Sequence, residues 1–288
     1  MNHLIMSLLR PQEFYNKALQ CTNEEALRDV LQKEVAYLNN AYTTVNSVKN
    51  AFTAYRNYFK DHEVSHPNID DTELEKLVFS KLRLTNDQML EFKKRKSAQV
   101  IDDMGDLRMV REEVIDSYLE KAVSLLRANS YLDLIIGLAA LTGRRTAEIA
   151  TSAEFTFLDA STLLFNGQLK VKGKLDVGPY EIPTLYDAPD LVDHLAILRK
   201  FRPQLVSQPK KFHDCCSKDL NLRTKKHFSN MFDCKFTPKD MRAFYAEICF
   251  KVINYKPNIS RPLYYARILG HGKDDVTTAQ SYDDFRIT

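Results

Sequence analysis

Residues 269–282 have the sequence LGHGKDDVTTAQSY, which places His271 directly after a Leu-Gly step and Tyr282 one short helical segment later. A tyrosine hydroxyl keeps its proton up to a pKa of about 10, so it is a poor nucleophile by itself. It attacks a phosphodiester only where cations bind the phosphate and stabilise the negative charge that develops there. If Tyr282 is a nucleophile, the chain must bring cationic side chains to it from elsewhere.

Two arginines in residues 142–149, TGRRTAEI, are the first candidates. Arg144 and Arg145 follow an apolar segment, residues 132–141, and Glu148 follows one helical turn later. A guanidinium can bind a phosphate through two parallel hydrogen bonds, which an ammonium cannot do as well. The alternative is that these charges only stabilise the carboxyl end of the preceding helix through its dipole.

A second basic pair, Lys239 and Arg242, follows Thr237 and Pro238. Threonine as N-cap and proline at the first helical position predict that a helix begins here. Residues three apart share a helix face, so Lys239 and Arg242 could hold one phosphate from two directions. The alternative is an ordinary exposed helix start.

Lysines in residues 166–174, NGQLKVKGK, are expected on or beside a hairpin turn. Lys170 and Lys172 alternate along the strand and therefore point to the same side. An ammonium near other cations could give its proton to a leaving 5′ oxygen, and either lysine could take this role. The alternative is an edge strand that its lysines protect from aggregation. Together the four segments indicate a site for cutting and rejoining DNA through a tyrosyl phosphate.

The composition places limits on the fold and on the partners. A chain of 288 residues with 44% apolar content is long enough for two domains, and the polar break at residues 101–106 predicts domains of 1–103 and 104–288. The net charge of +3 is too small to argue for nucleic-acid binding by itself. The apolar start, residues 1–10, is too short to span a bilayer.

The cysteine content favours a reducing compartment. Five cysteines without framework spacing are typical of the cytosol rather than of a secreted disulfide scaffold. Cys215 and Cys216 lie near His213, but adjacent cysteines lack the spacing of a zinc site. We therefore expect no metal.

Apolar periodicity predicts a mainly α fold. Capping boxes are expected at residues 22–25 and 85–88, and Ser130 is the expected N-cap of a helix. The expected helices are residues 11–20, 23–38, 41–60, 71–83, 86–98, 110–128, 131–142, 189–201, 217–231, 239–253, 261–269 and 275–282. Short apolar runs between turn residues predict a small antiparallel sheet from strands 155–158, 163–171 and 180–185.

Further basic residues are candidates for DNA contacts. Those in the first half, Lys93, Lys94, Arg95 and Lys96, could bind phosphates without sequence preference, although such a charge run is often only a solvated face. Those before the second basic pair are Lys210, Lys211, Lys218, Arg223, Lys225 and Lys226. We expect the helix that carries the last four to enter the major groove, with Asn221, Arg223 or Lys226 reading bases. Helical spacing favours core positions for Tyr55, Tyr58 and Phe59, although they could stack on bases.

The order of these motifs resembles the tyrosine recombinases, and within them the telomere resolvases. The shared pattern is a T-G-x-R-x-x-E box, a hairpin lysine, a K-x-x-R box, an L-G-H step and a tyrosine, over about residues 111–282. The resemblance assigns catalytic roles to Arg145, Lys170, Arg242, His271 and Tyr282. We add Lys239, which opens the second box, to the catalytic candidates, and we expect Arg144 and Lys172 to contact DNA. Lys239 and the Gly143-Arg144-Arg145 sequence are similar to the resolvase branch.

The resemblance implies a helical, DNA-clamping core-binding domain followed by a recombinase-type catalytic domain. Such an enzyme binds a palindromic replicated telomere junction in double-stranded DNA as a homodimer, cuts through 3′-phosphotyrosyl links and seals each end as a hairpin. It needs no metal, nucleotide or other cofactor and no membrane. It would act in the cytoplasm of a bacterial or phage-infected cell. Because the chain ends soon after Tyr282, we expect no large C-terminal DNA-binding domain.

Other functions remain open at this point. A recombinase or integrase would use the same residues to join two duplexes, and a type IB topoisomerase would relax supercoils without site preference. A DNA-binding relative without catalysis would not need the complete set of residues. The topology of the DNA product and a covalent protein–DNA adduct distinguish these functions.

Overall fold

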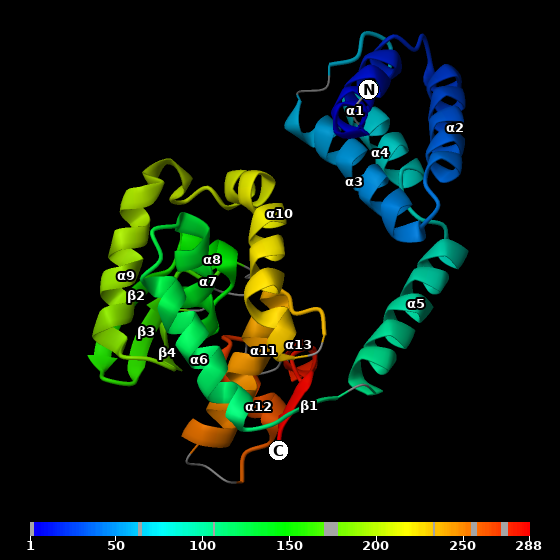
Figure 1. Ribbon diagram of the computed structural model, residues 1–288. Coiled ribbons are helices and arrows are strands. Elements are labelled where there is room, and N and C mark those ends of the chain that lie inside the picture. Colours follow the sequence, from blue (N-terminus) through cyan, green and yellow to red (C-terminus); the bar gives the residue numbers. More distant parts are fainter. Residues whose placement is uncertain are drawn as a thin grey trace. The chain divides into compact units, whose positions relative to one another are not determined.

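The computed structural model describes residues 3–62, 65–105, 107–169, 178–232, 234–254, 258–271 and 276–288. Its internal contacts divide the chain into two compact units, Met1–Gln99 and Val100–Thr288, where the sequence places the boundary after residue 103 (Figure 1). Both units are built mainly from α-helices. None of the described helices combines the length and the apolar character that crossing a bilayer requires.

The first unit is a helical bundle. Its helices are α1 (His3–Leu19), α2 (Glu24–Ala41), α3 (Val45–Asp61), α4 (Asp71–Lys81) and α5 (Asn86–Gly105), the last of which runs past the unit boundary. Phe14, Leu31, Phe52 and Leu74 lie in its core. Tyr55 and Phe59 are also buried, at 3% and 2% exposure, so they are core residues and are not available for base stacking.

One of the two predicted capping boxes is confirmed. The Thr85 N–H donates to Gln88 Oε1 at 3.0 Å, and the Gln88 N–H donates to Thr85 Oγ1 at 3.2 Å. The box expected at Thr22 is wrong by one residue. Asn23 is the N-cap, and its Oδ1 accepts from the Ala26 N–H at 2.9 Å, because asparagine caps a helix at least as well as threonine.

Helix α7 (Tyr131–Thr142) is the central helix of the second unit, and its predicted bounds are confirmed. Ser130 caps it, and almost every residue of it is buried. It ends at Gly143, which has φ 65°, and a Cβ there would lie 2.1 Å from a ring carbon of Tyr245. This left-handed position turns the chain sharply and sends Arg144 and Arg145 in a new direction.

The other helices of this unit surround α7 or lie near its carboxyl end. They are α6 (Glu113–Leu126), α8 (Thr146–Thr151), α9 (Ala188–Phe201), α10 (Pro209–Phe228), α11 (Pro238–Ile248), α12 (Arg261–Ile268) and α13 (Val276–Gln280), with a π-helical turn at Cys249–Ile253 and short 3₁₀ turns at Pro203–Leu205 and Ser229–Met231. Helix α10 begins earlier than the sequence predicts, because Pro209 serves as its first residue.

The predicted antiparallel sheet is confirmed. Strands β2 (Glu154–Asp159), β3 (Thr162–Asn166) and β4 (Tyr180–Pro183) lie in that order, with Phe165 of β3 between Phe155 and Tyr180. Strand β3 ends earlier than the expected 163–171. Lys170 and Lys172 follow it and lie outside the described residues.

A second, two-stranded sheet is not predicted from the sequence. Strand β1 (Arg108–Val110) pairs in parallel with β5 (Phe285–Ile287), so the last residues of the chain lie beside the start of the second unit (Figure 1). The helix expected from residue 110 begins only at Glu113, because β1 occupies the preceding residues.

Candidate active site

Arg145 and Glu148 open helix α8 as a pair. The Arg145 N–H donates to Glu148 Oε2 at 3.0 Å, and its guanidinium donates to Glu148 Oε1 at 2.5 Å. The Arg145 side chain stays 19% exposed, whereas Glu148 is fully buried. Burial lowers the pKa of Arg145, but Glu148 and the phenols of Tyr282 and Tyr180 raise it above its usual value. Arg145 is therefore a firmly charged group at the edge of the site.

The expectation that Arg144 contacts DNA is wrong. Its side chain is 1% exposed and donates to Thr142 O at 3.1 Å, to Ile268 O at 2.5 Å and to the Tyr180 hydroxyl. The guanidinium thus ties the end of α7 to β4 and α12. Because all its nitrogens bond within the protein, Arg144 supports the site from inside and does not face the DNA.

Arg242 on α11 is buried at 3% exposure and belongs to the same group of side chains as Arg145 and Glu148. Its two terminal nitrogens donate to Gly143 O and Leu269 O, each at 2.6 Å. Its Nε is buried without a hydrogen-bond partner among the described residues. The guanidinium carbon lies 5.4 Å from the ring centroid of Tyr282.

The arginines repel one another in this cluster. Burial, followed by the charges of Arg144 and Arg145, lowers the pKa of Arg242 to about 10, although Glu148 and Tyr282 partly oppose this. Burial raises the pKa of Glu148, but the charges of Arg242, Arg145 and Arg144 lower it by more. The pKa of Glu148 is therefore below its usual value. Glu148 balances one of three guanidinium charges, which leaves a site that an anion such as phosphate would complete.

His271 and Tyr282 complete the group. His271 is 9% exposed and follows Gly270, whose φ is 69°. A Cβ at Gly270 would lie 2.1 Å from the Tyr180 hydroxyl, so only glycine allows this close approach. The rings of His271 and Tyr282 have centroids 5.3 Å apart. Tyr282 is partly exposed and follows α13.

Lys239 and Arg242, which could hold one phosphate together, differ in their surroundings. The Lys239 side chain is 50% exposed and pairs with Asp284 Oδ2 at 3.2 Å, whereas Arg242 is buried. Lys239 therefore borders the site, at the turn that follows Tyr282.

The described residues that lead to the lysine segment also contact the site. Gln168 Nε2 donates to Gly270 O at 2.8 Å, and the Leu169 N–H approaches Glu148 Oε1 at 3.4 Å. The sequence analysis missed Gln168 and Tyr180 as supports of the site. Their signal is only positional, because in the sequence they lie on either side of the segment that contains Lys170 and Lys172.

The predicted DNA contacts differ in their surroundings. Lys93, Lys94 and Arg95 are exposed on α5, Arg95 pairs with Glu91 at 2.7 Å, and the side chain of Lys96 lies outside the described residues. On α10, Lys218 and Lys226 are exposed and Lys225 is half-buried.

Two candidate base readers on α10 differ in their surroundings. Arg223 pairs with Asp133 at 2.9 Å and also donates to Ser130 at 3.1 Å. Asn221 has its Oδ1 buried. The Arg223 side chain stays 44% exposed while it makes these contacts, so its role in reading bases stays a prediction.

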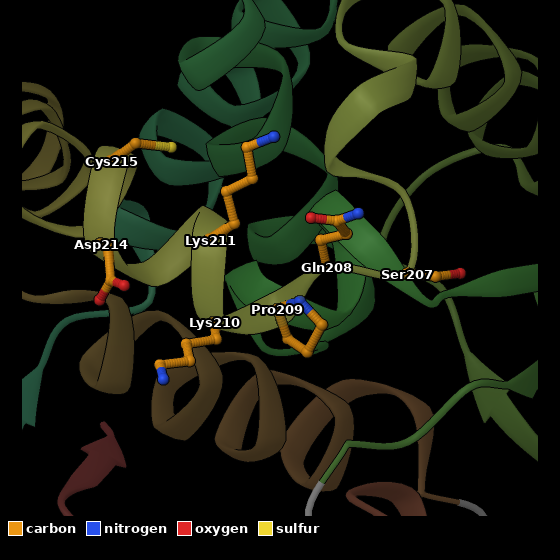
Figure 2. Close-up of a pocket in the computed structure, with 7 residues that line it drawn as sticks. All are labelled: Ser207, Gln208, Pro209, Lys210, Lys211, Asp214 and Cys215. Carbon is orange, nitrogen blue, oxygen red and sulfur yellow. The ribbon is translucent and has the colours of Figure 1, made fainter. Parts of the chain in front are cut away.

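A hollow of about 660 Å³ at the start of α10 lies outside this group of residues. Figure 2 shows Lys210 and Lys211 pointing in different directions from the helix. They do not converge on one anion. The lining residues are Ser207, Gln208, Pro209, Lys210, Lys211, Asp214 and Cys215.

Comparisons with known proteins give a matching family model and similar sequences. Residues 110–285 match the family model described as "Telomere resolvase ResT/TelK catalytic domain". A protelomerase of Yersinia phage PY54 is 29% identical over 224 residues, which cover 72% of this chain and 34% of that protein. This chain thus spans about a third of the length of that relative.

Solved structures match the whole fold. A protelomerase TelA covalently complexed with substrate DNA has a TM-score of 0.84 at 22% identity, covering 100% of this chain and 90% of that one. A TelA variant complexed with a DNA hairpin product has a TM-score of 0.83 at 22% identity, with 98% and 88% covered. At this identity the likeness establishes the fold, mainly α with a small antiparallel sheet.

Proposed function

Since the chain belongs to the telomere resolvase family, we propose that it cuts a replicated telomere junction and reseals each end as a covalently closed hairpin. The substrate is a palindromic junction in double-stranded DNA, and two copies of the chain bind it, one for each strand. The similar TelA structures, one with substrate DNA bound covalently and one with a DNA hairpin product, support this reaction.

One observation carries the proposal: Arg242 is buried with a lowered pKa, and its Nε lacks a partner among the described residues, beside the ring of Tyr282. A bound anion would stabilise this buried, incompletely hydrogen-bonded cation. A phosphate that accepts from Arg242 Nε and from Arg145 would neutralise the cluster. It would also lie next to the Tyr282 hydroxyl, where a nucleophile is needed.

In the first transfer, the Tyr282 hydroxyl oxygen attacks phosphorus and loses its proton. The bond between phosphorus and the 5′ oxygen breaks, and that oxygen takes up a proton, for which Lys170 or Lys172 is the candidate donor. Arg145, Arg242 and His271 stabilise the charge on the non-bridging oxygens. The products are a 3′-phosphotyrosyl link and a free 5′ hydroxyl.

In the second transfer, a 5′ hydroxyl of the complementary strand attacks the same phosphorus. The bond to Tyr282 breaks, the attacking hydroxyl gives up its proton, and the leaving phenolate takes up a proton, so the proton count is unchanged. Each transfer exchanges one ester bond of phosphorus for another, so the reaction needs no nucleotide as an energy source. We place this chemistry in the cytoplasm of a bacterial or phage-infected cell, on DNA.

The reaction is tested on a supercoiled plasmid that carries the palindromic junction of the replicon encoding this chain. The protein should convert it to linear DNA whose ends snap back on a denaturing gel. Joined duplexes would indicate a strand-exchanging recombinase, and relaxed circles would indicate a topoisomerase. An unchanged plasmid would contradict the proposed function.

A further inference from the structure

Glu247 is a fully buried carboxylate on α11, the helix that also carries Arg242. Its Oε2 accepts from the Tyr265 hydroxyl at 2.6 Å and from Arg261 Nε at 3.1 Å. Its Oε1 accepts from the backbone N–H of Ile287 at 3.2 Å. Burying a carboxylate is unfavourable unless donors such as these compensate for the lost solvation. The three donors are therefore needed to keep Glu247 in this position.

The donors to Glu247 come from two segments that lead to the site. Arg261 and Tyr265 lie on α12, which runs toward His271. Ile287 lies on β5, which begins directly after the turn that contains Tyr282. One carboxylate therefore joins the helix that carries Arg242 to the segment before His271 and to the segment after Tyr282.

Hydrogen bonds hold strand β5 on two sides, to β1 on one side and to Glu247 on the other. The Thr288 N–H donates to Val110 O of β1 at 3.0 Å, whereas the Ile287 N–H points away from β1 to Glu247. The side chain of Phe285 is fully buried. The chain downstream of Tyr282 thus has little freedom. Phe285 also contacts the ring of Phe244 on α11 at 5.3 Å between centroids, and Glu247 adds a hydrogen bond from the same helix to the backbone at Ile287.

We propose that Glu247 is a positioning residue for strand transfer: through β5 it sets where the Tyr282 hydroxyl lies relative to the phosphate bound by Arg242. This inference rests on the proposed function. In-line attack is sensitive to distance and direction, and a displacement of about 1 Å can lower a rate by about 100-fold. Glu247 itself touches neither the phosphate nor Tyr282.

The direct test is Glu247→Gln, which keeps the size of the side chain. An amide has one oxygen, and its NH₂ group would face donors, so at least one contact to Tyr265, Arg261 or Ile287 is lost. We expect cleavage of an oligonucleotide duplex carrying the junction to fall by roughly 10- to 100-fold, with DNA binding retained.

The first unit supplies a matched control. Glu34 also accepts from a tyrosine and an arginine, with Tyr55 Oη at 2.6 Å and Arg10 Nε at 2.9 Å from its Oε1. Glu34→Gln removes the same kind of buried carboxylate, but in the unit without Tyr282. It should lower the melting temperature as Glu247→Gln does, while cleavage stays within about twofold, because Glu34 shares no contact with the described residues of the site.

An external nucleophile separates positioning of Tyr282 from damage to the whole site. In a Tyr282→Phe background, the hydroperoxide anion from added hydrogen peroxide can attack phosphorus, break the bond to the 5′ oxygen and leave a 3′ peroxyphosphate, while the 5′ oxygen takes a proton. This route needs the phosphate-binding cations but no placed tyrosine. Adding Glu247→Gln to this background should change peroxide-dependent cleavage by no more than about twofold.

A second pair of variants tests the link at its other end. Ile287→Pro removes the N–H that reaches Glu247, whereas Ile287→Ala keeps it and removes the buried side chain. The proline variant should cleave at least about tenfold more slowly than the alanine variant.

The outcomes separate this inference from the proposed function. Cleavage by the unchanged chain, slowed in Glu247→Gln and Ile287→Pro but not in the peroxide assay, would support the inference. Normal tyrosine-dependent cleavage in Glu247→Gln, or an equal loss in the peroxide assay, would overturn it and leave the proposed function intact. If the unchanged chain does not cleave the junction at all, the proposed function fails first and the inference fails with it.

Discussion

Arg242→Gln tests whether this arginine is placed for a phosphate rather than for stability. Its surroundings lower the pKa of Arg242 from 12.5 to about 10. A change of this size corresponds to about 3 kcal/mol of unfavourable interaction for the charged group in the folded state. Against this, glutamine leaves Gly143 O or Leu269 O without its donor, which costs about 1–3 kcal/mol. The two effects nearly cancel.

We therefore expect Arg242→Gln to change the free energy of unfolding, measured by urea denaturation, by less than about 2 kcal/mol. Cleavage of junction DNA should fall by about 100-fold or more, because a donor to the developing charge is lost. Arg199 is a matched control, since it also donates to two backbone carbonyls, Ile149 O at 2.6 Å and Ala153 O at 2.8 Å, and burial lowers its pKa.

Arg199→Gln should retain near-normal cleavage whatever its stability. If Arg242→Gln cleaved DNA normally, its assigned role at the phosphate would be refuted. If Arg242→Gln lowered the free energy of unfolding far more than Arg199→Gln does, the buried guanidinium of Arg242 would be needed for stability. The argument from its lowered pKa would then be wrong.

Three further predictions follow from the site. Glu148→Gln should lower the free energy of unfolding near pH 7, and the deficit should shrink in urea titrations as the pH falls below about 4.5, because Glu148 has a lower pKa folded than unfolded and its contribution is present only while it is ionised. Gly143→Ala should destabilise by about 2 kcal/mol or more in the same assay, since it combines a positive φ with a contact to Tyr245; a stabilised variant would contradict the described turn. Of Lys170→Ala and Lys172→Ala, the one that removes the proton donor should regain cleavage when sulfur replaces the leaving 5′ oxygen; rescue of neither would place the donor elsewhere.

Local sequence signals were sufficient to predict the elements whose ends are marked by capping or turn residues. Helix α7 has an apolar run between a serine N-cap and a glycine that adopts a positive φ, and its bounds could be predicted. Helix α11 begins with threonine and proline, which form a recognisable start. The three strands of the antiparallel sheet alternate with turn residues and were also predictable.

Features that depend on distant packing could not be predicted in this way. Arg144 and Arg145 are adjacent and chemically identical, and only the positions of Tyr180 and Ile268 show that the first is enclosed by protein. Strands β1 and β5 have three residues each, which is too short to show a periodic pattern. They also lie at opposite ends of the sequence of the second unit, so no local signal predicts that they pair. The role inferred for Glu247 likewise depends on a contact with β5.

The most direct test of the account is to identify the residue that becomes linked to DNA. A duplex with a nick near the cut site loses a short fragment after cleavage and traps the covalent intermediate. Proteolysis and mass spectrometry of the trapped complex should show a 3′-phosphonucleotide on Tyr282, and Tyr282→Phe should bind the duplex without forming the adduct. An adduct on any other residue, or an adduct in Tyr282→Phe, would contradict the account.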